Sequence, residues 1–164
     1  MTSLPKIKTP TSNLGKIIKI FGAVLFGISW YYLLSNYGEI PLEVPTHFNY
    51  EGVADNFGNK IQLFKVLGIG TVIYVAIFIA GFFPHKLNYL AEITEENAFR
   101  HYSLGKELLL FINLAISITI SYLSMKTVHN VLNGQTDLDA WMSPVILVII
   151  FAPLVYYLVK LAKK

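Results

Sequence analysis

Residues 66–83 read VLGIGTVIYVAIFIAGFF, a stretch of eighteen residues without a charged side chain. A helix needs about 20 apolar residues to cross a hydrocarbon core that is about 30 Å thick. Three further apolar runs of similar length lie at residues 17–34, 108–125 and 142–159. Buried helices of water-soluble proteins usually carry a charged face. The four runs therefore predict an all-α integral membrane protein with four transmembrane helices.

The composition agrees with a membrane protein. Hydrophobic residues make up 54% of the chain and charged residues only 14%, whereas soluble domains carry about 25% charged residues. The chain has no cysteine, which excludes disulfides, thiolate metal sites and cysteine nucleophiles. The first run follows basic residues, as in a signal peptide. However, it is long and ends at Trp30-Tyr31-Tyr32 without a small-residue cleavage site, so we expect a retained anchor.

We expect one domain over residues 1–164. Residues 1–16 form a tail, 17–83 form a helix pair with a compact loop at 36–60, and 84–164 form a second helix pair. An even number of spans puts both termini on one side of the membrane. That side holds ten of the thirteen basic residues: Lys6, Lys8, Lys16, Lys19, Lys86, Arg100, Lys106, Lys160, Lys163 and Lys164. Basic loops stay in the cytoplasm, so both termini are predicted inside and the loop at 36–60 outside.

The loop between the second and third spans contains ITEENAFRHYSLGKELLLF, residues 93–111. Thr94 is a good N-cap, and acidic residues in the first turn, here Glu95 and Glu96, favour a helix. We expect a cytoplasmic surface helix before the third transmembrane helix that runs on into this span, with an ion pair between Glu96 and Arg100. His85 and His101 are isolated and are predicted to be solvated.

The spans themselves carry few polar groups. Asn113, Ser117, Ser121 and Ser124 share one helical face, which should turn inward and allow close helix packing; a polar permeation path is the alternative. No ionisable residue lies in the middle of a span, which counts against an autonomous transporter. Close helix contacts are also predicted at glycines, and a helix start and a kink at Ser143-Pro144 and Pro153. The glycines are Gly22, Gly27, Gly68 and Gly70.

The outer loop ends with PTHFNYEGVADNFGNK, residues 45–60. It contains the same turn signal twice, because residues 49–52 and 55–58 each begin with Asn or Asp and end with glycine, the preference of a type I turn. Proline at position 45 favours extended backbone before it. These turn signals predict a compact cap with a short hairpin, and they account for five residues without invoking a function. The five are Pro45, Asn49, Gly52, Asp55 and Gly58.

Turn chemistry does not account for His47 and Lys60. Lys60 is expected either to snorkel at the start of the second span or to join a polar cluster with His47, Asn49 and Asp55. In such a cluster Asp55 orients the imidazole or pairs with the ammonium. A metal is the alternative, with His129, Asp137 and Asp139 of the second outer loop as further partners, but a lysine nearby disfavours a cation. No catalytic residues, metal site or cofactor are predicted, because the sequence shows no nucleophile–base set and no phosphate-binding glycine loop.

The seven residues of this loop spell P-x-H-x-N-x-x-G-x-x-D-x-x-G-x-K. This pattern resembles domain of unknown function 1648, a small bacterial and archaeal membrane module that also opens the SdpI-type proteins. Those proteins confer immunity to a secreted toxic peptide and signal its presence, and they carry further helices after the module. Residues 96–102 are similar to an E-N-A-x-R-x-Y segment of short relatives. The resemblance implies a prokaryotic inner or cytoplasmic membrane protein whose family-defining feature is this loop.

Together these observations predict a non-enzymatic sensor, immunity or accessory protein. Its outer loop would recognise a secreted peptide, a lipid or another membrane protein, and no nucleic acid. The alternative is a small transport subunit, or a metal-dependent membrane enzyme, centred on His47 and Asp55. The predicted recognition residues are those of the loop motif: Pro45, His47, Asn49, Gly52, Asp55, Gly58 and Lys60.

Overall fold

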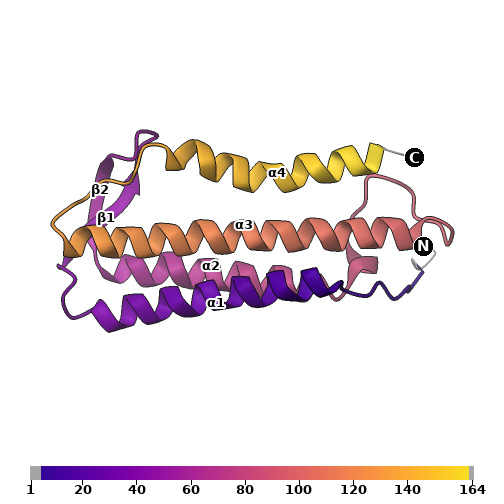
Figure 1. Cartoon of the computed structure of the whole chain (residues 1–164), viewed down its shortest axis with the longest axis horizontal. Coiled ribbons are helices and arrows are strands. Elements are labelled where there is room, and N and C mark those ends of the chain that lie inside the picture. Colours follow the sequence, from indigo (N-terminus) through magenta and orange to yellow (C-terminus); the bar gives the residue numbers. More distant parts are fainter. Residues whose placement is uncertain (1–4, 163–164) are drawn as a thin grey trace.

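The structure is a computed structural model that describes residues 5–162 as a helical bundle with a β-hairpin at one end (Figure 1). The four helices are long and apolar enough to cross a membrane. They are α1 (Asn13–Asn36), α2 (Ile61–Ala80), α3 (Ala98–Leu132) and α4 (Met142–Ala162). The hairpin consists of β1 (Glu43–Phe48) and β2 (Ala54–Asn59), and a 3-10 turn, η1 (Pro84–Lys86), follows α2. Lys163 and Lys164, which we assigned to the cytoplasmic side, lie outside the described residues.

The burial pattern is the inverse of that of a water-soluble protein. Large aliphatic and aromatic side chains of α1, α2 and α4 are exposed, among them Ile20, Ile69 and Val148. Polar side chains of α3 are buried, among them Asn113 and Ser117. Lipid is as apolar as these side chains, so polar groups turn toward other helices. The protein is therefore a multi-pass membrane protein, as the sequence predicted.

Helix α3 lies at the centre of the bundle, between the α1–α2 pair and α4 (Figure 1). It contacts each of the other three helices, whereas α1 and α2 have fewer contacts with one another. Its 35 residues span about 52 Å, so it extends beyond a hydrocarbon core of about 30 Å. The predicted polar face of residues 113–124 is buried, which confirms that it turns inward.

Two of the four predicted glycine contacts are present. A Cβ atom at Gly70 would lie 2.6 Å from Ile120 Cγ2, and one at Gly22 would lie 2.8 Å from Ser117 Oγ, so both glycines let α3 approach closely. Gly27 and Gly68 were predicted wrongly, because nothing lies within 4 Å of a Cβ atom at either position. They occupy the faces of α1 and α2 that point away from α3.

Polar bonds join α1 to α2. The Trp30 Nε1 donates to Thr71 Oγ1 at 3.0 Å, and Thr71 in turn donates to the Leu67 carbonyl. The Tyr74 hydroxyl donates to the Lys19 carbonyl at 2.7 Å. These bonds satisfy side-chain donors that would otherwise face lipid.

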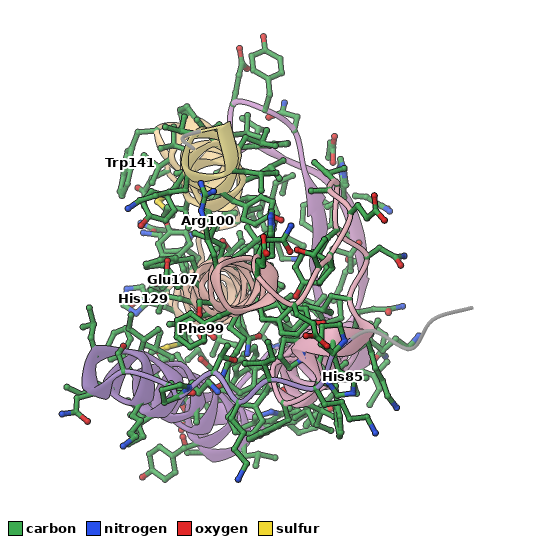
Figure 2. The ribbon with its side chains drawn as sticks, turned by 90° about the vertical axis from the view of Figure 1, so that its right-hand side faces the viewer. His85, Phe99, Arg100, Glu107, His129 and Trp141 are labelled. Atoms are coloured by element: carbon green, nitrogen blue, oxygen red, sulfur yellow. The ribbon has the colours of Figure 1, made fainter. Side chains whose placement is uncertain are left out.

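The loop before α3 differs from the prediction. Thr94 is no N-cap, because α3 starts at Ala98 and residues 95–97 form a turn. The expectation that the helix of this loop runs on into the third span is confirmed, because both belong to α3. Arg100 reaches toward α4, where its Nη2 donates to the Lys160 carbonyl at 3.1 Å (Figure 2). The expected ion pair with Glu96 stays a prediction.

The aromatic ring of Tyr89 fastens this loop to the bundle. His101 is buried rather than solvated, with its ring 6.2 Å from that of Tyr89. The Tyr89 hydroxyl donates to the Pro84 carbonyl at 2.8 Å, and burial raises the pKa of this hydroxyl well above its usual value. Tyr89 therefore remains a hydrogen-bond donor at any physiological pH.

Helix ends also differ in detail. Helix α2 stops at Ala80, three residues before the predicted end of the span, and α4 starts at Met142, so Ser143 lies in its first turn rather than at its N-cap. Pro153 lies inside α4 as predicted.

The two glycines of α2 provide a test of the packing. Gly70→Ala should lower the free energy of unfolding by about 1–3 kcal/mol, because the added methyl group overpacks against Ile120. Gly68→Ala makes the same chemical change on the same helix in open space and should have no such cost. Unfolding of the purified protein in detergent, followed by circular dichroism, measures both. Equal loss in the two variants would contradict this packing.

Candidate functional site

The predicted cap is a two-stranded antiparallel hairpin, and its turn is the first of the two predicted turns. Gly52 N donates to the Asn49 carbonyl at 3.0 Å, and Asn49 N donates to the Val53 carbonyl at 2.9 Å. The Asn49 side chain accepts hydrogen bonds from Glu51 N and Val53 N. Gly52 has φ +83°, a conformation that favours glycine. Asn49 and Gly52 thus build the turn.

The second predicted turn is wrong. Residues 55–58 belong to β2, where Gly58 pairs with Val44 and Phe57 pairs with Pro45. A Cβ atom at Gly58 would lie 3.1 Å from Thr46 Cγ2, so this glycine provides room for the neighbouring strand and no turn. Pro45 is buried in the hairpin, and its strand neighbour Val44 is fully buried in the bundle core.

Irregular strand pairing surrounds His47. The regular register is interrupted between Pro45 and His47 and again between His47 and Phe48, so that Thr46 on β1 and Asp55 on β2 have no paired partner across the ladder. Bulges of this kind bend a strand and re-aim its side chains. They place His47 Nδ1 at 2.5 Å from Asp55 Oδ1. The predicted orienting contact between these two residues is present in the structure.

The His47–Asp55 pair is open to its surroundings. The side chains are 66% and 45% exposed, respectively. The contact is an ion pair when the imidazole is protonated, and otherwise a hydrogen bond from the neutral imidazole Nδ1–H to the carboxylate. Such an exposed pair contributes little to stability, typically about 0–1 kcal/mol. Loss of this contact alone is therefore expected to have little effect on folding.

Lys60 does not join this pair. Its ammonium turns toward the end of α1, where Nζ donates to the carbonyls of Tyr37 and Ile40 at 2.9 and 3.0 Å and lies 4.3 Å from the centre of the Tyr37 ring. Tyr37 is the C-cap of α1 and Ile40 lies in the turn that follows, where backbone acceptors lack partners within the helix. Lys60 therefore caps α1 from the start of α2, a structural role that sequence spacing alone does not reveal.

The second loop at this end, residues 133–141, fastens the hairpin to α3. Leu138 N donates to the Gly52 carbonyl at 2.7 Å, and Ala54 N donates to Asp137 Oδ1 at 3.1 Å. A Cβ atom at Gly52 would lie 2.5 Å from the Leu138 carbonyl oxygen, so only glycine permits this approach. Asp137 therefore serves the hairpin backbone and does not join His47.

Asp139 fixes the end of this loop that precedes α4. Asp139 Oδ2 lies 3.1 Å from Lys126 Nζ and accepts a hydrogen bond from the Tyr122 hydroxyl. The bond from Lys126, and after it the one from Tyr122, hold the pKa of the Asp139 carboxyl below its usual value. Because the pKa of Asp139 is lowered, its contacts with Lys126 and Tyr122 stabilise the fold at neutral pH. This stabilisation is lost only as the pH falls through the lowered pKa.

Within residues 5–162, no group of three or more histidine, cysteine, aspartate or glutamate side chains is placed to hold a metal ion. His129, the third candidate partner of the second loop, is exposed near the end of α3. The residues that the sequence proposed as one cluster thus divide into separate groups. Of these residues, His47 and Asp55 are the two that form an exposed pair on the hairpin.

Lys60 can be tested against a lysine one helical turn away. Lys60→Met keeps the aliphatic stem but leaves the carbonyls of Tyr37 and Ile40 without their charged donor, and should cost about 2 kcal/mol of unfolding free energy. Lys65→Met, at an exposed position, should change stability little. Chemical unfolding in detergent compares the two. A Lys60→Met variant as stable as Lys65→Met would show that the cap is dispensable.

The family comparison falls on this hairpin and the helices beside it. Residues 24–71 match the family described as "Domain of unknown function (DUF1648)". The chain is also 25% identical, over 170 aligned positions, to an uncharacterized protein of the archaeon Archaeoglobus fulgidus; the alignment covers 94% of this chain and 91% of that protein. No solved structure matches the chain. The matching model is that of the domain which the loop motif resembles, so this resemblance is confirmed over residues 24–71.

Proposed function

We propose that the protein is a non-enzymatic sensor, immunity or accessory protein of a prokaryotic cell membrane, and that its hairpin recognises a secreted peptide or another membrane protein outside the cell. One observation carries this proposal: the exposed His47–Asp55 contact lies where the regular strand pairing is interrupted on both sides of His47. The other motif residues have structural tasks, since they form the turn, pair the strands or cap α1. Of the seven motif residues, His47 and Asp55 are therefore the two that are available to bind a partner.

The chemistry of the pair suits binding better than catalysis. Among the described residues, no hydroxyl or amine lies in hydrogen-bond contact with either side chain, whereas covalent or acid–base catalysis needs a nucleophile beside the base. The pair offers a carboxylate and an imidazole on a surface that backbone bonds to Leu138 and Asp137 hold in place. A rigid surface loses little conformational entropy when a partner binds.

The distribution of basic residues supports an orientation with both termini in the cytoplasm. The start of α1 and the end of α4 lie at the end of the bundle opposite the hairpin (Figure 1). The described basic residues at this terminal end include Lys16, Lys86 and Arg100, and loops rich in lysine and arginine stay in the cytoplasm. The hairpin then faces outward. The SdpI-like role in immunity or signalling rests on the motif resemblance alone.

Single cysteines test the orientation directly, because the chain has no cysteine of its own. Asn56→Cys on β2 should react with a membrane-impermeant maleimide in intact cells, since Asn56 is exposed on the hairpin. Glu95→Cys, exposed in the loop before α3, should react only after permeabilisation. Gel-shift labelling reads both, and the reverse pattern would place the hairpin in the cytoplasm.

Loss of the His47 side chain should separate recognition from folding. His47→Ala should change the Tm by no more than a few degrees, because an exposed pair is worth about 0–1 kcal/mol. It should nevertheless fail to restore resistance to envelope stress or secreted peptides in a deletion strain that the unaltered gene rescues. Asp55→Asn should behave in the same way.

His129→Ala is the matched control, since it removes an exposed histidine at the same end of the bundle. It should rescue the deletion strain fully. If His47→Ala also rescues fully, or if it unfolds the purified protein, the hairpin pair is not a recognition site. A deletion strain with unchanged sensitivity to all these stresses would remove the sensor and immunity roles together.

A further inference from the structure

A cavity of about 170 Å³ lies at the end of the bundle opposite the hairpin, between the start of α1, the last turn of α2 and the first half of α3. A water molecule occupies about 30 Å³ of liquid, so this space holds a group of several heavy atoms. Figure 2 views the bundle from this end, with Glu107 of α3 on the flank between α1 and α4. Motif residues and the hairpin play no part in the cavity.

Two lysines line this cavity. Lys106 Nζ donates to the Thr9 carbonyl, which uses one of its three donors. Lys19 Nζ lies over the aromatic rings of Phe78 and Phe82, 4.9 and 5.2 Å from their centres. Within the described part of the chain, neither lysine forms an ion pair with a carboxylate; Glu107, which also lines the cavity, is exposed and is not in contact with either.

The N-terminus of α1 opens into the same space. Ser12 caps the helix by accepting a hydrogen bond from Gly15 N at 3.1 Å, and both residues line the cavity. No acidic residue lies in the first turn of α1 to offset its positive end. Unpaired backbone N–H groups and the helix dipole at such an end attract anions.

Two buried polar atoms in the lining have no partner among the described residues. They are the Thr9 hydroxyl and the Asn113 side-chain oxygen, on residues that are only 7% and 5% exposed. A buried polar group without a hydrogen bond costs about 1–3 kcal/mol, so a ligand in the cavity that bonded to one of these lining residues would remove part of this cost. The Thr9 hydroxyl can donate to an anion, whereas the unpaired Asn113 oxygen is an acceptor and can bond only to a hydroxyl or N–H group of a ligand.

We propose that this cavity binds a phosphate group. Two ammonium groups, an uncompensated helix N-terminus and an unpaired hydroxyl converge on it, and the combination disfavours a metal cation and favours an oxyanion. The phosphate belongs either to the headgroup of an anionic lipid or to a soluble phosphate compound. This site is independent of the recognition role of the hairpin, so either proposal can fail without the other.

Thermal shift of the full-length protein in detergent separates the two sources. Phosphatidylglycerol is titrated into the micelles against phosphatidylcholine, and inorganic phosphate is titrated separately at constant ionic strength. Phosphatidylglycerol or phosphate should raise the Tm in a saturable manner. Saturation with phosphatidylglycerol alone identifies a lipid headgroup, and saturation with inorganic phosphate identifies a soluble phosphate; both outcomes support the site.

The variants assign binding to this cavity. Lys19→Met and Lys106→Met should each raise the half-saturating concentration about tenfold, the effect of losing one charge-assisted hydrogen bond. Thr9→Val removes a hydroxyl that has no partner to lose, so it should leave the unliganded Tm unchanged and weaken binding about threefold to tenfold. Lys106→Met also loses its bond to the Thr9 carbonyl and can fail to fold for that reason. In that case binding by Thr9→Val still tests the proposal.

Lys86→Met is the matched control. Lys86 lies at the same end of the bundle with its Nζ 5.2 Å from the centre of the Phe83 ring, but it does not line the cavity. Its removal should change the half-saturating concentration less than twofold. The proposal is overturned if neither ligand raises the Tm, or if Lys86→Met weakens binding as much as Lys19→Met.

Discussion

The arrangement of the helices depends on one constraint, that polar side chains in a membrane must face protein and not lipid. Helix α3 carries most of the buried polar residues of the spans, and it is accordingly the helix that the other three surround. Close approach by α1 and α2 follows at Gly22 and Gly70, where α3 side chains occupy the space of a Cβ atom. Helix α4 needs only an apolar surface. Among the described helices, α3 is the one with which it makes extensive contacts.

The polar residues of the hairpin have different structural roles. Asn49 and Gly52 make the turn, and Lys60 reaches back to close the end of α1. Bonds to Asp137 and Leu138 then hold the hairpin against the second loop. Of the seven motif residues, only His47 and Asp55 then present exposed side chains. The part of the seven-residue motif that is available for recognition is therefore one exposed pair, and the other five residues have structural roles.

Much of the fold followed from the sequence, because hydrophobic run length and the face of the Asn113–Ser124 stripe depend on local pattern alone. The Asn49–Gly52 turn was also predictable from residue chemistry. The reading of Asp55–Gly58 as a turn failed because the pairing of β2 with β1 overrode a local preference. The task of Lys60 and the cavity beside Lys19 were not predictable, because both depend on segments that are distant in sequence and meet only in the folded bundle.

The bonds of Gly52 and Ala54 to residues 137 and 138 also set an order of events during synthesis. The hairpin is complete in sequence once residue 59 has left the ribosome, but its two backbone groups find their partners only after α3 has been inserted. Until then a strand edge carries unpaired polar groups, the feature by which incomplete chains aggregate or attract proteases. A chain that has reached only residue 136 therefore contains the whole motif but lacks both partners that hold the hairpin in place.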